Sequence, residues 1–163
     1  MLWREAPGLV AAVERLPRTL CHFDLHPGNV LASGSGAVLV DWACVGIGPL
    51  GEDPANLVAT AVLDLHLPAA LLPALFRRVV AAYHQGLNDG GWSWDRAEAE
   101  RAIRLALVVR FAWVLPDLLR ATADGRAVLG GRPLTEVAGP WEAVAWLVAD
   151  AASALRDAGR AGW

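Results

Sequence analysis

The sequence predicts an α+β fold that is mostly helical. Short β-branched runs and glycine-rich turns occupy the chain up to residue 53, whereas an Ala- and Leu-rich pattern with helical spacing follows from residue 54. Hydrophobic residues make up 55% of the chain and charged residues 19%, which is too apolar for intrinsic disorder. With 163 residues, the chain has the length of one domain. We therefore expect one unit over residues 1–163, with a β-containing region at 19–53 and a helical region at 54–163.

The first region predicts a short helix followed by a β-hairpin. The helix covers residues 6–16, and residues 19–23 are expected to be extended. Two apolar runs, at 29–32 and 37–40, are joined by Ser-Gly-Ser-Gly at 33–36. Such a spacing predicts a hairpin with a four-residue turn.

The second region predicts four helices. They cover residues 53–65, 68–87, 93–121, and 133 or 136 to 158. Asp53 followed by a proline is a typical helix start. Pro73 is expected to delay the second helix by a turn and Pro116 to bend the third. Either Ser93 or Asp95 is expected to cap the third helix.

Charge and composition exclude several classes of function. The net charge of -3 gives no basic surface, so we expect no nucleic-acid partner. The most apolar long stretch, residues 102–119, is interrupted by charges and a proline, so no membrane partner is expected. The N-terminus lacks a signal-peptide pattern, which predicts a cytoplasmic location. Cys21 and Cys44 are expected to be buried free thiols in a reducing compartment.

One segment carries residues suited to chemistry. It reads HFDLHPGN from His22 to Asn29, and Asp41 follows twelve residues after Asn29, at the end of the predicted hairpin. The hairpin turns the chain back by about its own length, so we expect Asp41 to lie beside Asn29 and near Asp24. Two carboxylates and an amide oxygen form a set of hard oxygen ligands that suits Mg²⁺ held together with substrate phosphates.

HFDLHPGN and VLVDW resemble two motifs of the aminoglycoside phosphotransferase and choline kinase family, a relative of the protein kinases. The resemblance implies a protein-kinase-like C-terminal lobe, in which the hairpin carries the catalytic loop and a helical bundle builds the acceptor pocket. It also implies a phosphotransferase, that is, a kinase, which moves the γ-phosphate of ATP to a hydroxyl of a small molecule. Phosphoryl transfer of this kind depends mostly on positioning and charge neutralisation.

The resemblance implies a role for each polar residue of the two motifs. Asp24 would accept or orient the proton of the acceptor hydroxyl. Asn29 and Asp41 would bind the Mg²⁺ that bridges the ATP phosphates. His26 stands where protein kinases often carry a lysine, which implies a catalytic role close to the transferred phosphoryl group. His22 would hold the loop by hydrogen bonds.

Around these motifs the chain departs from the family at two positions. The family usually has Gly where this chain has Phe23, a difference that concerns the local backbone conformation. It more often has Asp where Asn56 stands, and we expect Asn56 to face the loop and accept a hydrogen bond from its backbone. Asp53 is expected to cap the helix that follows, and Trp42 to serve in packing.

A dinucleotide-binding turn is one alternative. Residues 46–51 read GIGPLG, which fits G-x-G-x-x-G. However, Glu52 and Asp53 put negative charge where a pyrophosphate would sit, and Pro49 lacks an N–H. We expect an irregular loop here instead.

A zinc hydrolase is a second alternative, built on His22, Asp24 and His26 alternating along a strand. The sequence His-Pro-Gly-Asn breaks that strand just after His26. His66 and His84 fall in predicted helices without an HExxH pattern, so this interpretation is disfavoured.

The family also has an N-terminal lobe that covers the nucleotide and supplies a lysine. The chain contains 14 Arg and no Lys, and only about 20 residues precede the loop, too few for such a lobe. We therefore expect the N-lobe to be absent, which leaves the nucleotide grip incomplete. We expect the chain to be either the C-lobe of a phosphotransferase, as a fragment, a truncated reading frame or a split subunit, or a non-catalytic small-molecule binding module. Expected partners are a small alcohol and either a separate N-lobe chain or a second copy of itself.

Overall fold

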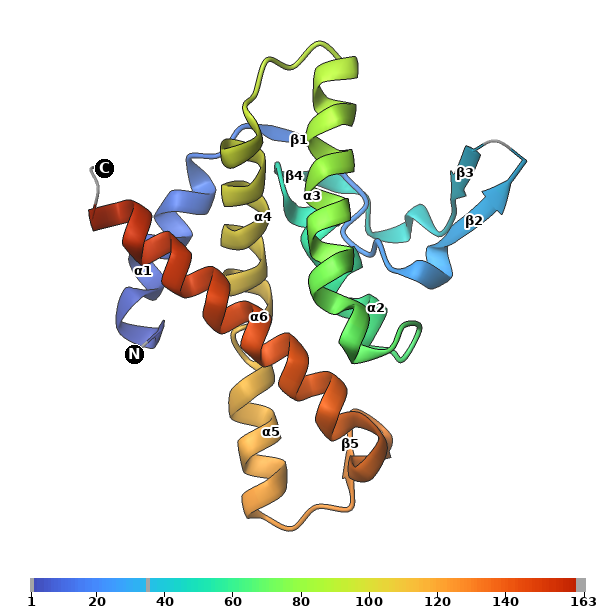
Figure 1. The fold of residues 1–163 in the computed structure, drawn as a ribbon, viewed down its shortest axis with the longest axis vertical. Helices are drawn as coiled ribbons and strands as arrows, with labels where there is room; N and C mark the ends of the chain where they lie inside the picture. Colours follow the sequence, from blue (N-terminus) through green and yellow to red (C-terminus); the bar gives the residue numbers. More distant parts are fainter. Residues whose placement is uncertain (1, 35, 161–163) are drawn as a thin grey trace.

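The computed structural model describes residues 2–34 and 36–160. Within this part, six α-helices accompany three two-stranded antiparallel sheets (Figure 1). The predicted class, mostly helical α+β, is therefore confirmed. The sheets are small, and the helices supply most of the buried apolar residues.

Helix α4 (Arg96–Phe111) lies at the centre of the molecule. It packs against α1 (Leu2–Glu14), α2 (Glu52–Leu63), α3 (Leu72–Asp89) and α6 (Leu134–Arg160), the last of which crosses it in Figure 1. Most of the apolar residues of α4 are buried; the largest of them are Ile103, Leu105, Leu107, Val108 and Phe111. The release of water from these side chains is the main force that holds the helices together.

The helix boundaries differ from prediction where prolines are involved. α1 begins before Pro7, which lies inside it rather than near its start. A single turn of 3-10 helix, Ala69–Leu71, precedes α3, so the delay expected from Pro73 is confirmed. Asp95 is the N-cap of α4 and forms a capping box with Glu98.

The predicted third helix is in fact two helices. α4 ends at Phe111 and α5 covers Val114–Ala123. Pro116 lies in the first turn of α5, where its missing N–H is tolerated, so the prediction of a bend at this proline is wrong. The break precedes it and brings Trp113 edge-on to Trp141 of α6, with ring centroids 5.3 Å apart.

The strands confirm the predicted hairpin and add two pairs that were not predicted. The pairs are β1 (Arg18–Cys21) with β4 (Gly46–Pro49), β2 (Val30–Ser33) with β3 (Gly36–Leu39), and β5 (Val128–Leu129) with β6 (Arg132–Pro133). Ser35, in the predicted turn of the hairpin, lies outside the described residues. The expectation of an irregular loop at 46–51 is wrong, because residues 46–49 form β4.

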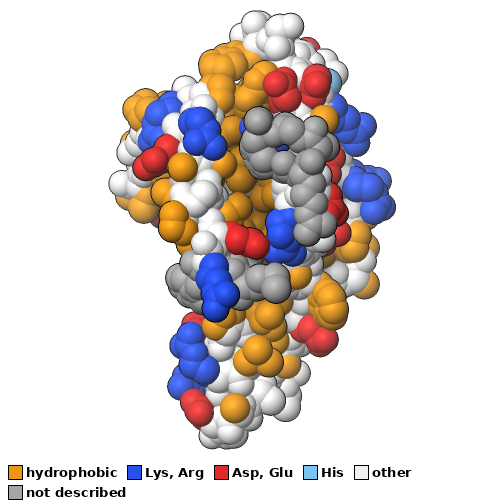
Figure 2. Space-filling view, turned by 90° about the vertical axis from the view of Figure 1, so that its left-hand side faces the viewer, with side chains coloured by type: hydrophobic (Ala, Val, Ile, Leu, Met, Phe, Trp, Pro, Cys, Tyr) orange, Lys and Arg blue, Asp and Glu red, His pale blue; other side chains and the backbone are white. Residues whose placement is uncertain are grey.

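Two further features concern the surface. Cys44 is exposed whereas Cys21 is buried, so the prediction of two buried thiols is wrong for Cys44. On the face where α1 and the end of α6 meet, hydrophobic side chains gather in a hollow bordered by charged ones (Figure 2).

None of the described helices has the length and apolar character needed to cross a membrane.

Candidate active site

Asn29 connects the loop at residues 22–29 with the end of the hairpin. Its side-chain Nδ2 donates to the backbone oxygen of Asp24 at 3.0 Å and, at 3.4 Å, to Oδ2 of the same residue. Its backbone oxygen accepts a hydrogen bond from the N–H of Val40 at 3.0 Å. Since Asp41 follows Val40 directly, the fold brings Asp24, Asn29 and Asp41 into one region.

The side chains of Asn29 and Asp41 both keep oxygen atoms available. Asn29 is buried, and its Nδ2 rather than its Oδ1 is used by Asp24. Asp41 is exposed, adopts the left-handed conformation with φ of 60° and makes no capping hydrogen bond with its side chain. Among the described residues, none donates to Asn29 Oδ1 or to the Asp41 carboxylate. Oxygen atoms of this type are the ligands that a hard divalent cation prefers.

His22 braces this arrangement from inside. Its side chain is 1% exposed, and its Nε2 lies 2.8 Å from the backbone oxygen of Val40. Nε2 is therefore the donor, and within the described part of the chain Nδ1 has no hydrogen-bond partner. The ring centroid lies 4.7 Å from that of Trp42. His22 thus ties the start of the loop to the end of the hairpin, the position that its expected holding role requires.

His26 caps the short 3-10 helix Pro27–Asn29. Its Nδ1 accepts a hydrogen bond from the backbone N–H of Gly28 at 3.1 Å. Its ring also stacks on that of His66, with centroids 6.2 Å apart. His26 therefore has a structural role within the loop, while its approach to a phosphoryl group stays a prediction.

Asp53 is a residue of the site whose contacts the sequence did not reveal. Its carboxylate accepts hydrogen bonds from the backbone N–H groups of His22 at 2.7 Å and Phe23 at 2.9 Å. The prediction that it caps α2 is wrong, because the N-cap is Gly51 and Asp53 lies one residue inside the helix. A carboxylate at a helix N-terminus is still favoured by the helix dipole, so Asp53 satisfies two loop donors at a position that suits its charge.

Arg110 holds the loop from the end of α4. Its guanidinium donates to the backbone oxygen of Phe23 at 2.9 Å and forms an ion pair with Glu52. Arg110 lies 87 residues after Phe23 in the chain, so no local pattern indicates this contact. The backbone of Phe23 is therefore held from both sides, because its N–H donates to Asp53 and its carbonyl oxygen accepts from Arg110.

Asn56 faces the loop, as expected from its position after the second motif. Its Nδ2 donates to the backbone oxygen of Leu25 at 3.2 Å, so it acts as a donor rather than as the predicted acceptor. An aspartate, the more common residue in the family, cannot make this bond while ionised. Because Asn56 is buried, its amide needs a partner within the protein, and the loop carbonyl of Leu25 is that partner.

The comparison with known proteins agrees with this geometry. The sequence matches the model of the Phosphotransferase enzyme family over residues 1–100, a segment that contains the loop, the hairpin and helices α1 to α3, together with the start of α4. No curated protein and no solved structure matches the chain significantly. The matched segment covers more than half of the 163 residues, and the chain therefore belongs to the phosphotransferase enzyme family.

Proposed function

We propose that the chain is the C-terminal lobe of an ATP-dependent phosphotransferase that transfers the γ-phosphate to a hydroxyl of a small molecule. One observation carries the proposal: Asn29 is hydrogen-bonded both to Asp24 and to Val40, the residue before Asp41. Membership of the phosphotransferase family supports the same reaction class.

In this proposal Asp24 receives or orients the proton of the acceptor hydroxyl. Its Oδ2 accepts the weaker of two hydrogen bonds from Asn29, which fixes the carboxylate beside the loop while Oδ1 keeps its lone pairs. If the transition state of phosphoryl transfer is loose, as most analyses hold, positioning matters more than the strength of the base. Asp53, Arg110 and Asn56 are positioning residues, because they hold the backbone that carries Asp24.

Asn29 and Asp41 are the proposed ligands of Mg²⁺. Their donor set fits the ion, since both offer side-chain oxygens that no described residue occupies, and Asp41 supplies a negative charge. When bound, Mg²⁺ neutralises charge on the ATP phosphates. The lysine that grips those phosphates in the family has no counterpart among the residues of this chain. We propose that a separate N-lobe supplies it.

The metal assignment can be tested without the nucleotide lobe by using Mn²⁺ in place of Mg²⁺. Binding to the purified chain is measured by the relaxation rate of water protons. We expect Asp41→Asn and Asn29→Ala to weaken Mn²⁺ binding by at least about tenfold, because each removes one of few ligands. Asp124→Asn is the matched control, since Asp124 pairs with Arg126 at the exposed end of α5. Equal affinity in all four proteins would refute the assignment.

Transfer itself is tested by a screen of small alcohols with Mg²⁺ and ATP labelled at the γ-phosphate, with and without an added lysine-bearing N-lobe. We expect labelled alcohol only when the lobe is present and at least about a hundredfold less with Asp24→Asn, in line with the contribution of a general base. Transfer well above background by the chain alone would contradict the proposal of a separate lobe. Mn²⁺ binding without any transfer would favour a binding module.

A further inference from the structure

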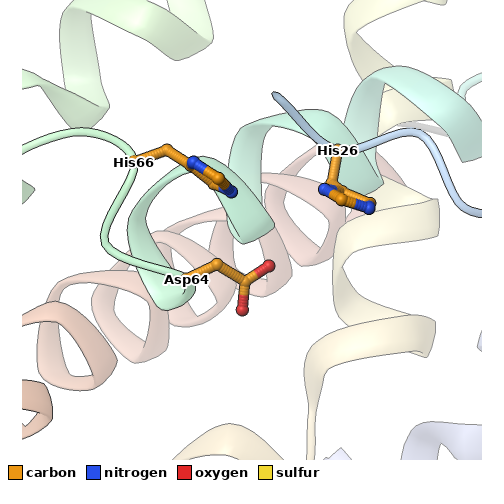
Figure 3. A group of neighbouring side chains, drawn as sticks. All are labelled: His26, Asp64 and His66. Carbon is orange, nitrogen blue, oxygen red and sulfur yellow. The ribbon is translucent and has the colours of Figure 1, made fainter. Parts of the chain in front are cut away.

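Three side chains outside the proposed phosphate site converge next to the loop. His26 comes from the loop, and Asp64 and His66 come from the turn that follows α2 (Figure 3). One ligand atom from each, a ring nitrogen or a carboxylate oxygen, lies within 4.8 Å of the other two. In the described part of the chain, no other group of three such residues lies as close.

The turn after α2 brings two of these residues to the same side. α2 ends at Leu63, and Leu65 adopts the left-handed conformation with φ of 63°. The prediction that α2 continues to residue 65 is therefore wrong, and His66 lies in a turn rather than in a helix. In Figure 3, the carboxylate of Asp64 and the ring of His66 both extend toward His26.

We propose that His26, Asp64 and His66 form a binding site for a divalent transition-metal ion such as Zn²⁺. Two imidazoles and one carboxylate with room for a solvent ligand match the donor sets of open zinc sites. Imidazole nitrogen favours Zn²⁺ over Mg²⁺, which takes oxygen ligands. Zinc ligands about 2.0–2.2 Å from the ion lie roughly 3.3 Å from one another in a tetrahedron, so ligand atoms that lie up to 4.8 Å apart must approach by at most about 1.5 Å. Asp64 and His66 are exposed and His26 is half-buried, which leaves the side chains space to move.

Binding of the ion has a structural consequence for the loop. A neutral metal-bound imidazole carries its proton on the nitrogen that does not bind the metal. If Nε2 of His26 binds the ion, Nδ1 is protonated and cannot accept the N–H of Gly28; if Nδ1 binds it, the accepting lone pair is used. In either case the hydrogen bond between Gly28 and His26 breaks. Because this bond caps the 3-10 turn that ends at Asn29, occupation of the site loosens that turn.

The site is tested by titrating the purified chain with zinc chloride in a calorimeter. The Cys44→Ser variant serves as the parent protein, because an exposed thiol such as that of Cys44 can compete for zinc. We expect one bound Zn²⁺, with affinity at least about tenfold weaker in His66→Ala and in Asp64→Asn. His84→Ala is the matched control, since His84 lies in α3 and bonds the backbone oxygen of Trp94. An affinity that is unchanged in His66→Ala, or equally lost in His84→Ala, would overturn the proposal.

A second measurement is specific to the coupling with the loop. Hydrogen exchange at the amide of Gly28 is expected to become at least about tenfold faster on addition of Zn²⁺, since the amide loses its partner. The same addition should leave exchange unchanged in the Asp64→Asn, His66→Ala double variant. Zinc binding without faster exchange at Gly28 would show that His26 is not a ligand. Because no ATP or acceptor is used, failure here is distinguishable from failure of the proposed phosphotransfer.

Discussion

Phe23 shows how one side chain shapes the site. It has a φ of 62°, a conformation that costs a residue with a Cβ atom on the order of 1–2 kcal/mol. Its ring lies over β4, where a Cβ atom on Gly48 would come within 2.5 Å of the ring and one on Gly46 within 3.1 Å. The two glycines therefore leave space for the ring, and the ring packing offsets the strain at the position where the family usually has glycine.

This packing predicts the effect of a methyl group at position 48. We expect Gly48→Ala to lower the free energy of unfolding by about 1–3 kcal/mol, because the new Cβ overlaps the Phe23 ring and approaches Sγ of Cys21. In a Phe23→Gly background the same substitution should cost clearly less, as only the contact with Cys21 remains. Urea unfolding of the four proteins measures both costs.

Gly8→Ala is the control for this series. Nothing lies within 4 Å of a Cβ atom at Gly8, which is in α1, so the substitution should be neutral or stabilising by up to about 1 kcal/mol. An equal cost of Gly48→Ala in both backgrounds would mean that the Phe23 ring is not what the glycine accommodates.

At the scale of elements, α2 and the loop are held together by polar bonds that start on α2. Asp53 binds two backbone N–H groups of the loop, and Asn56, one turn later, binds the backbone oxygen of Leu25. Glu52 reaches the same loop indirectly, through Arg110. The first two turns of α2 thus fix the backbone on both sides of Asp24, which is the residue proposed to act on the acceptor.

We expect Asp53→Asn to destabilise the protein by about 1–3 kcal/mol. The side-chain NH₂ of the new asparagine would face the backbone N–H of either His22 or Phe23, and two donors cannot bond to each other. One charge-assisted hydrogen bond is therefore lost, and that backbone N–H is left without a partner. Urea unfolding measures the change, and exchange at the amides of His22 and Phe23 locates it. Asp124→Asn is expected to change the free energy of unfolding by less than about 0.5 kcal/mol, because its ion pair with Arg126 is exposed. Equal effects would contradict the bracing role of Asp53.

At the scale of the whole molecule, the two cysteines lie in different environments: Cys21 is buried and Cys44 is exposed. Burial raises the pKa of the Cys21 thiol to about 11, and the negative charges of Asp53 and Glu52 act in the same direction. Cys44 lies in the short turn Trp42–Cys44 and is exposed. The folded protein therefore holds one thiol in its protonated form and presents the other to solvent.

This difference predicts how stability depends on pH. Between about pH 9 and pH 11 the Cys21 thiol ionises in the unfolded chain but keeps its proton in the folded one, so the unfolded state binds fewer protons. The free energy of unfolding should therefore fall as the pH rises through this window. The fall should be smaller in Cys21→Ala when both proteins carry Cys44→Ser, as measured by urea unfolding at several pH values. An identical pH dependence would show that Cys21 does not titrate differently in the two states.

Local sequence patterns were enough to predict the helical α+β class, the hairpin and the proximity of Asn29 to the end of that hairpin. These features follow from local periodicity, turn residues and the capping of helices, all of which act over a few residues. The register of β2 with β3, for example, follows from two apolar runs and one short turn, so the return of the chain toward Asn29 was predictable.

The contacts that hold the loop, and the residues that lie beside it, depend on tertiary packing and were not predictable from local patterns. Arg110 contacts a loop residue 87 positions away in the chain, and Asp53 contacts loop residues 30 and 31 positions away. His66, in the turn after α2, lies beside His26 of the loop. Such contacts depend on how α2 and α4 pack, and packing is set by the fit of many buried side chains rather than by any short pattern. The same reason explains why residues 46–49 were predicted as a loop rather than as β4. Gly46 and Gly48 leave space for the ring of Phe23, and this packing is visible only in the folded structure.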